Sequence, residues 1–209
     1  MVTSVKRTAV TVTCQPASMV TCSYLADVAV NRAPGALLIV QELVNTRDVE
    51  AGTDSIDAPA GLRSWLAERS LAPADLRPTG DDVARVAEFR EALRSLLHAN
   101  NGGTVDPEEL RSLNRAGRGG LRVRFDGDGG AVLEPQPEEP IAAAIGAIVA
   151  IVFTAMADGT FERLKACPGR DCGWAFYDLS KNRSARWCSM AVCGSREKVR
   201  AHRARRVTA

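Results

Sequence analysis

Apolar residues recur at helical spacing through much of the first 160 positions of the chain. Residues 36–46 are mostly apolar and fit either a helix or a buried strand. Further along, Leu62, Trp65 and Leu66 lie on one face of a predicted helix that Asp57 is placed to cap. Both segments are therefore expected to contribute to a hydrophobic core.

A long helix is predicted over residues 81–100, where apolar residues recur every three or four positions and a Gly-Gly pair follows as a stop. The next helix begins at residues 106–109 (DPEE), which combine a capping residue, a proline in the first turn and a glutamate three residues after the cap. Leu110 and Leu113 are expected to face inward from this short helix.

The pattern changes to alternation at residues 121–125, and a glycine-rich turn at 126–130 leads to further apolar residues, which predicts a β-hairpin. An alanine-rich apolar run of 16 residues follows at 141–156, with Glu138 and Glu139 at the positive end of its helix dipole. A helix that spans a membrane needs about 20 such residues, so we interpret the run as a buried core helix and expect no membrane association.

Charge is divided unevenly along the chain. Residues 161–209 carry 12 Lys and Arg against 4 Asp and Glu, a net charge of +8, whereas residues 1–160 carry 15 against 21, a net charge of −6. This division indicates a basic C-terminal segment suited to a polyanion, although a solvated basic tail would give the same count.

Residues 1–35 show no clear period and are treated as an N-terminal extension without an assigned function, in which Met19 is an alternative start. The stretch after Lys6 and Arg7 is too short and too polar for the apolar region of a secretory signal. We therefore expect a reducing, cytoplasmic setting, where clustered cysteines are more often metal ligands than disulfides.

The chain has six cysteines, and its last 43 residues hold four of them: Cys167, Cys172, Cys188 and Cys193. Four residues separate the members of each pair, and fifteen residues separate the two pairs. Such pairs can bring four thiolates to one tetrahedral ion, so we predict one structural zinc ion at this site. Cys14 and Cys22 are not expected to be ligands, because the C-terminal set is already complete.

Other interpretations of the four cysteines are buried core thiols, two disulfides, or an iron site. Iron is the most serious rival, because the geometry and softness of four thiolates suit both metals. A catalytic zinc ion is disfavoured, since four thiolates close its coordination shell. We find no Ser/His/Asp set, paired-carboxylate signature or cofactor loop in the sequence, and we expect no enzymatic activity.

A basic helix is predicted from about residue 190 to residue 206, with Val199 packed inward together with Met190 and Val192. Arginines on one face of an anchored helix suit phosphate contacts and guanine edges. The alternative is a basic helix that docks on an acidic protein partner. The predicted nucleic-acid contacts, which include two residues between the cysteine pairs, are Arg183, Arg186, Arg196, Lys198, Arg200, Arg203, Arg205 and Arg206.

The C-terminal part of the chain resembles the CGNR-type zinc finger of bacterial proteins. The resemblance rests on residues 172–174 (CGW), 182–190 (NRSARWCSM) and 193–196 (CGSR). The family name expects asparagine at position 195, where this chain has Ser195. That difference leaves the metal ligands unaffected and puts the role of this side chain in question.

Residues 36–160 are similar to the ABATE domain, which usually precedes this finger and is described as a stress-induced transcription regulator. The similarity rests on residues 43–47 (LVNTR), on the hairpin, and on the alanine-rich helix that leads into residues 163–167 (RLKAC). It implies a DNA-binding transcription regulator with a helical domain at 36–160 and a zinc finger at 161–209. The sequence does not indicate a small-molecule effector or an oligomeric state.

The fold expected from these observations is α+β. A mainly helical N-terminal domain with a small β-hairpin would precede a compact four-cysteine zinc finger, built from a short hairpin and the basic helix.

Overall fold

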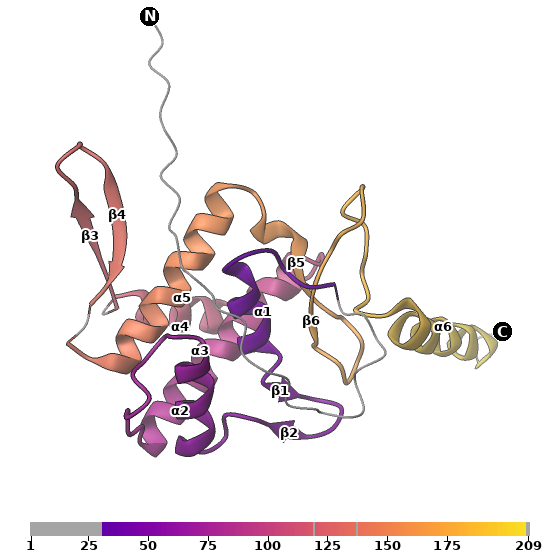
Figure 1. Ribbon diagram of the computed structural model, residues 1–209. Coiled ribbons are helices and arrows are strands. Elements are labelled where there is room, and N and C mark those ends of the chain that lie inside the picture. The colour runs from indigo at the N-terminus through magenta and orange to yellow at the C-terminus, as the bar shows by residue number, and fades with distance from the viewer. Residues whose placement is uncertain (1–30, 119, 137, 208–209) are drawn as a thin grey trace, which may run out of the picture.

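The structure is a computed structural model that describes residues 31–118, 120–136 and 138–207 (Figure 1). Three expectations lie outside the described residues. They are the absence of a function for residues 1–30 of the extension, the alternative start at Met19, and the non-ligand role of Cys14 and Cys22.

Six α-helices are present in the described part of the chain, five in the body and one at its C-terminal end (Figure 1). The first and fifth pack against each other and against the third, and the fourth lies against the third and the fifth. Residues 36–46 therefore form a helix and not a strand. In chain order the helices are α1 (Leu37–Val44), α2 (Pro59–Glu68), α3 (Gly80–Ala99), α4 (Pro107–Gly117), α5 (Pro140–Ala157) and α6 (Ser195–Val207).

The core lies between α1, α3 and α5, whose facing side chains, Leu43, Phe89 and Ile145 among them, are almost fully buried. Burying one side chain of this size stabilises a fold by about 1.5–3 kcal/mol. The predicted apolar face of α2 is buried as well. Hydrophobic periodicity thus located the helices that build the body.

Two local predictions were wrong. Asp57 does not cap α2, because the helix begins after Ala58 with Pro59 in its first turn and no side-chain cap. Leu110 of α4 does not face inward and is 47% exposed, since it lines an open cleft between α4 and its neighbours. Leu113, on the same helix, packs against the core as expected.

Three antiparallel two-stranded sheets accompany the helices in the described residues. The hairpin predicted in the body stands out from it in Figure 1, with Val123 and Phe125 exposed, whereas the last hairpin is buried along both strands. The pairs are β1 (Arg47–Asp48) with β2 (Thr53–Asp54), β3 (Leu121–Phe125) with β4 (Ala131–Pro135), and β5 (Leu164–Ala166) with β6 (Ala175–Tyr177).

Within the described residues, α5 is the one helix whose length and composition would allow it to cross a membrane. The carboxylate of Glu139 caps its first turn by accepting hydrogen bonds from the backbone of Ile141 and Ala142. One face of the helix lies in the core, as predicted. A Cβ atom built on Gly146 would lie 2.0 Å from the carbonyl oxygen of Gly120, so this face admits only glycine where the chain enters β3.

The described residues form the mixed α+β structure that was predicted. A helical N-terminal region with small hairpins is followed by a four-cysteine cluster, a short hairpin and a helix.

Candidate metal centre

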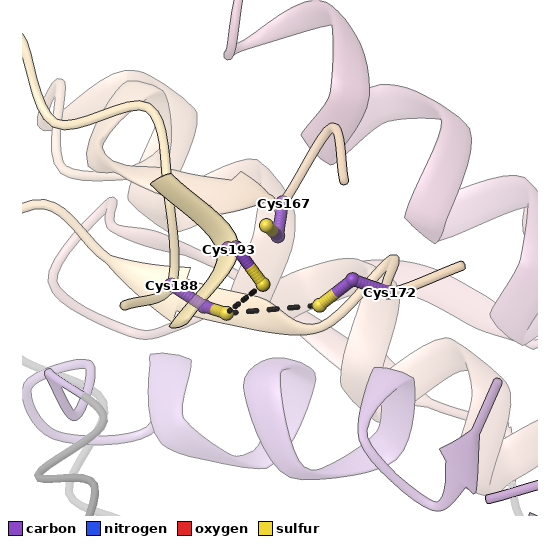
Figure 2. Close-up of side chains that lie close together, drawn as sticks. All are labelled: Cys167, Cys172, Cys188 and Cys193. Atoms are coloured by element: carbon purple, nitrogen blue, oxygen red, sulfur yellow. Dashed lines mark hydrogen bonds between the residues drawn. The ribbon is translucent and has the colours of Figure 1, made fainter. Parts of the chain in front are cut away.

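The sulfur atoms of the four C-terminal cysteines converge on one point (Figure 2). All four lie within 4.8 Å of one another, and Cys188 Sγ lies 3.6 Å from Sγ of both Cys172 and Cys193. A disulfide bond would require about 2.05 Å, and all four thiols are free. A tetrahedral ion with bonds of about 2.3 Å holds its sulfur ligands about 3.8 Å apart. The cluster therefore fits one metal ion.

The four cysteines lie on two short segments, the turn after β5 and the segment that includes a π-helix. Cys167 directly follows β5, and its N–H donates to the carbonyl of Trp174 at 2.9 Å, while Cys172 N–H donates to Gly169 O at 3.0 Å. Cys188 precedes a five-residue π-helix, η2 (Met190–Gly194), that contains Cys193. The four residues between the members of each pair thus form a tight turn. Each turn directs its two thiols toward the centre of the cluster.

Gly169 keeps the space beside the sulfurs open. A Cβ atom at this position would lie 3.2 Å from Cys172 Cβ, 3.6 Å from Cys167 Sγ and 3.7 Å from Cys193 Sγ. A Cβ atom would thus be tight against Cys172 Cβ and in van der Waals contact with two sulfur atoms, so a longer side chain would crowd the cluster. The absence of a side chain at Gly169 therefore helps to keep the four sulfur atoms close together.

Apolar side chains cover the cluster. Phe176 of β6 is buried beside Cys167 and Cys193, and Trp187 and Val192 pack against the same group. Phe176 therefore shields the thiols from solvent on the side of β6. An environment of this kind disfavours isolated charge, so thiolates at this position need a compensating cation.

The thiols also act on one another electrostatically. Hydrogen bonds from Cys172 and Cys188 lower the pKa of Cys167, and the same contacts raise the pKa of both partners. Burial raises the pKa of Cys193. A bound dication at the centre of the cluster would stabilise all four as thiolates.

The hairpin that carries the first two cysteines belongs to the core of the helical body. β5 packs against α3, β6 packs against α1, and Leu164 and Tyr177 join the same buried cluster as the helices. The C-terminal segment is therefore not an appendage. Its ligand-bearing turn sits on a rigid support that the metal does not have to supply.

Side-chain amides fix the hairpin to the body. Asn45, the residue that ends α1, accepts a hydrogen bond from Ala175 N–H at 2.7 Å and donates to Ala175 O at 2.9 Å. Gln41 Nε2 donates to the same carbonyl at 3.2 Å. Asn45 belongs to the 43–47 motif that carries the ABATE resemblance, but the sequence does not indicate this contact.

The end of α3 provides a second set of contacts that the sequence did not predict. Asn100 donates to the carbonyls of Phe161 and Leu164, each at 2.9 Å, and Asn101 donates to Ala166 O and Arg186 O, each at 2.8 Å. Leu164 and Ala166 are the first and last residues of β5, and Arg186 lies two residues before Cys188. Two adjacent asparagines therefore tie both halves of the cysteine cluster to one helix terminus.

Arg94 of α3 is buried between the body and the cysteine turn. Its guanidinium donates to the carbonyl of Gly173, which follows Cys172, and to Val44 O at 2.8 Å. Glu91 balances its charge at 2.9 Å and also pairs with the buried Arg90. From the sequence, an arginine within a helix is expected on the helix surface. The burial of Arg94 could therefore not be predicted.

A buried ion pair orders the loop between the cysteine pairs. Lys165 of β5 lies 2.7 Å from Asp178, and it also donates to the carbonyls of Arg183 and Ala185 at 2.7 and 3.1 Å. Burial acts to raise the pKa of Asp178, but hydrogen bonds from Lys165 and Ser180 outweigh it and hold the pKa below its usual value. The side chain of Lys165, on β5, thus fixes the conformation of the loop before Cys188.

Comparison with known families agrees with this arrangement. Residues 163–206 match the CGNR zinc finger. Residues 39–159 match the ABATE family, whose description is "Putative stress-induced transcription regulator". The chain belongs to the ABATE family. No curated protein matches the chain. The family description names a transcription regulator, and only residues 160–162, directly before the hairpin that joins the finger to the body, separate the two matches.

In the CGNR finger, Ser195 is the first residue of α6 and its hydroxyl donates to Met190 O at 3.2 Å. The side chain that departs from the family name therefore closes the π-helix turn around Cys193. Its contact is local to the ligand-bearing turn.

The predicted DNA-contacting residues fall into two groups. Arg183 and Arg186 are exposed on the loop before Cys188, and Arg183 pairs with Glu162 at 2.7 Å. The other six lie on α6, which extends away from the body in Figure 1 and has exposed basic side chains throughout: Arg196, Lys198, Arg200, Arg203, Arg205 and Arg206.

Two of the helix arginines have acidic partners. Arg196 makes a two-pronged contact with Glu50 of the β1–β2 turn, at 2.8 and 2.9 Å. Arg200 pairs with Glu197 one turn away and with Asp171 at 3.7 Å. The first turns of α6 are therefore linked to the ABATE domain and to the turn between Cys167 and Cys172.

The inward packing expected for part of this helix was wrong. Val199 is 49% exposed and Met190 is 56% exposed, because α6 leaves the body after its first turn. Val192 does pack against the cysteine cluster. The helix is therefore anchored through its first turn and the preceding π-helix, not through an apolar face.

Proposed function

We propose that this ABATE-family protein binds DNA through α6 of its CGNR finger, as a transcription regulator whose metal ion is structural. One observation carries the proposal. Residues 195–206 form a basic helix with no buried residue, and the helix begins at the residue after Gly194, directly beyond the ligand-bearing turn. A helix that is anchored at one end and buries none of its side chains can enter a DNA groove without unfolding any other part of the protein.

The four cysteines would hold one zinc ion. Four thiolates close its shell, so zinc would supply folding energy and fix the direction of α6, with no open position for chemistry. The family name of the finger supports zinc over iron. On this proposal the division at residue 160 separates two roles, a helical ABATE domain and a DNA-binding finger, which share one hydrophobic core.

Contacts to DNA would follow from the charges on α6. Lys198, Arg203 and Arg206 have no acidic partner among the described residues, and we assign them to phosphates together with Arg205.

Arg196 and Arg200 lie nearest the metal anchor and are the candidates for base edges. Their exposed ion pairs are worth about 0–1 kcal/mol each, so DNA can displace them at small cost. Arg183 and Arg186 would contact the phosphates from the neighbouring loop.

The test is binding of the purified, metal-loaded chain to random-sequence DNA over a salt series, with selection of enriched sites. Removing one side chain that binds a phosphate should lower the slope of log K against log salt by about 0.9. Arg206→Ala should therefore reduce the slope by about that amount on every sequence. Removal of a base-reading guanidinium at Arg200 should cost about 1–3 kcal/mol and relax preference at one position.

A second candidate function is docking of α6 on an acidic protein partner. The exposed side chains of Met190 and Val199 favour it, because DNA phosphates would not cover them and a protein could. This function predicts weak DNA binding with no enriched site and no difference between the Arg196 and Arg206 variants on DNA. The selection experiment therefore distinguishes the two functions.

A further inference from the structure

A cleft of about 850 Å³ lies between α3, α4 and α5, away from the cysteine cluster and from α6. Its floor is apolar, with Phe89 and Leu93 from α3 and Val149 and Val152 from α5. Small-molecule sites typically have volumes of about 300–1,000 Å³ and a mainly apolar lining. Both the size and the lining of this cleft fall within that class.

The mouth of the cleft exposes apolar surface. Leu110 of α4 is 47% exposed and Met156 of α5 is 49% exposed, and both line the cleft. Leu110, which was expected to face inward, thus lies at this opening. An apolar ligand group in the cleft would remove both side chains from water, at about 25 cal/mol for each Å² covered.

One edge of the cleft is basic. Arg111, Arg115 and Arg118 line it, but the first two are committed to Glu108 and Glu88. Arg118 ends α4, is exposed, and has no acidic partner or side-chain hydrogen bond among the described residues. The polar edge of the site therefore presents one uncommitted guanidinium beside an apolar floor.

We propose that this cleft binds a small amphipathic carboxylate, with its apolar chain or ring on the floor and its carboxylate on Arg118. Guanidinium groups bind carboxylates through two parallel charge-assisted hydrogen bonds. The apolar floor selects against small polar anions, and the basic edge selects against cationic amphiphiles. The site lies in the ABATE domain, and its occupancy does not depend on DNA binding by the finger.

The experiment is calorimetric titration of the full, metal-loaded chain with n-decanoate, n-decanol, decyltrimethylammonium and acetate, with the two ionic amphiphiles below their micelle concentrations and decanol below its solubility limit. Decanoate should bind saturably at one site, decanol more weakly, and the other two not detectably. Equal binding of decanoate and decanol, or the absence of saturable decanoate binding, would overturn the proposal.

Matched variants locate the site. Arg118→Gln should weaken decanoate binding about tenfold, the effect of losing a charged hydrogen bond, and leave decanol unchanged. Arg63→Gln is the control, because Arg63 is also exposed, lies on α2, and has no acidic partner in the described part of the chain. Equal effects of the two substitutions would contradict the placement of the carboxylate.

The floor can be tested in two ways. Val149→Phe fills the cleft and should weaken both decanoate and decanol. If that variant folds poorly, Leu110→Ser alters an exposed position and should weaken both ligands without loss of helical signal. Sedimentation should show no change of mass with decanoate. A dimer that Leu110→Ser dissociates, with no bound decanoate, would show that a second copy covers the cleft and would overturn the proposal.

Discussion

The side-chain amide of Asn45 pairs with both backbone groups of Ala175, accepting from its N–H at 2.7 Å and donating to its carbonyl at 2.9 Å. Ala175 opens β6, three residues after Cys172, and Asn45 ends α1. The amide thus takes the place that a neighbouring strand would occupy at the edge of the hairpin. A helix that lies 130 residues earlier in the chain therefore helps to position the first two cysteines of the cluster.

Replacing Asn45 by alanine should both destabilise the protein and loosen the metal site. The change leaves the buried N–H of Ala175 unpaired, at a cost of about 1–3 kcal/mol, whereas the carbonyl of Ala175 keeps its hydrogen bond from Gln41. Urea unfolding measures the first effect, and the rate of metal transfer to a chelator measures the second. Asn114→Ala, at an exposed position of α4, is the control. If both variants release metal at the same rate, the contact does not support the ligand turn.

The cysteine cluster could be predicted because its geometry is local. Two pairs with four intervening residues form tight turns whatever surrounds them, and Gly169 supplies the space between the thiols. The helices could be predicted for a similar reason, since hydrophobic periodicity reports burial along one face. The α+β organisation follows from these two signals.

The support of the cluster could not be predicted, because it depends on side chains that bond to distant backbone carbonyls. Asn45, Asn100 and Arg94 all act in this way, and a carbonyl group leaves no mark in the sequence. Arg94 is the clearest case, since an arginine within a helix is usually exposed. The exposure of Val199 was missed for the converse reason: an apolar residue at helical spacing suggests a partner that this helix lacks.

Removing one ligand should separate the two roles of the C-terminal segment. In Cys188→Ser we expect loss of the bound zinc ion and rapid hydrogen exchange in α6 and in the loop before it. Amides of α3 and α5 should stay protected, because their core includes the hairpin side chains but none of the thiols. Elemental analysis and hydrogen-exchange mass spectrometry give both measurements. Full metal content in this variant, or iron in place of zinc, would refute the assignment.

The carboxylate of Glu91 should give a measurable acid dependence of stability. Burial acts to raise its pKa, but the guanidinium groups of Arg94 and Arg90 outweigh it and hold the pKa below 4.5. A lowered pKa stabilises the fold above the unfolded value of 4.5, and that stabilisation is lost as the pH falls through the folded-state pKa. Glu91→Gln should therefore be less stable than the natural chain at neutral pH.

The difference between Glu91→Gln and the natural chain should shrink as the pH falls below 4.5. Urea unfolding at a series of pH values measures this stability difference. Loss of metal in acid affects both proteins alike and does not enter the difference. Glu138→Gln, at an exposed position, is the control and should show no comparable trend. A stability difference that does not change with pH would show that the charge of Glu91 is not what holds Arg90 and Arg94.

The ion pair between Arg196 and Glu50 makes DNA binding by α6 testable from the opposite side of the contact. Glu50 lies in the β1–β2 turn of the ABATE domain, and its carboxylate holds the guanidinium of Arg196 at 2.8 Å. If DNA takes over that guanidinium, Glu50→Gln should raise the affinity for DNA, because the pair no longer has to be broken. The gain should be at most about fivefold, since an exposed pair contributes about 0–1 kcal/mol.

Loss of a negative charge near DNA would also raise affinity without any role for Arg196, so the experiment needs a double-mutant cycle. We expect Arg196→Gln to weaken DNA binding, and Glu50→Gln to give a smaller gain in the Arg196→Gln background than in the natural chain. Glu68→Gln, an exposed carboxylate on α2, controls for the general effect of charge. An equal gain from Glu50→Gln in both backgrounds would mean that Arg196 remains with the ABATE domain when DNA binds.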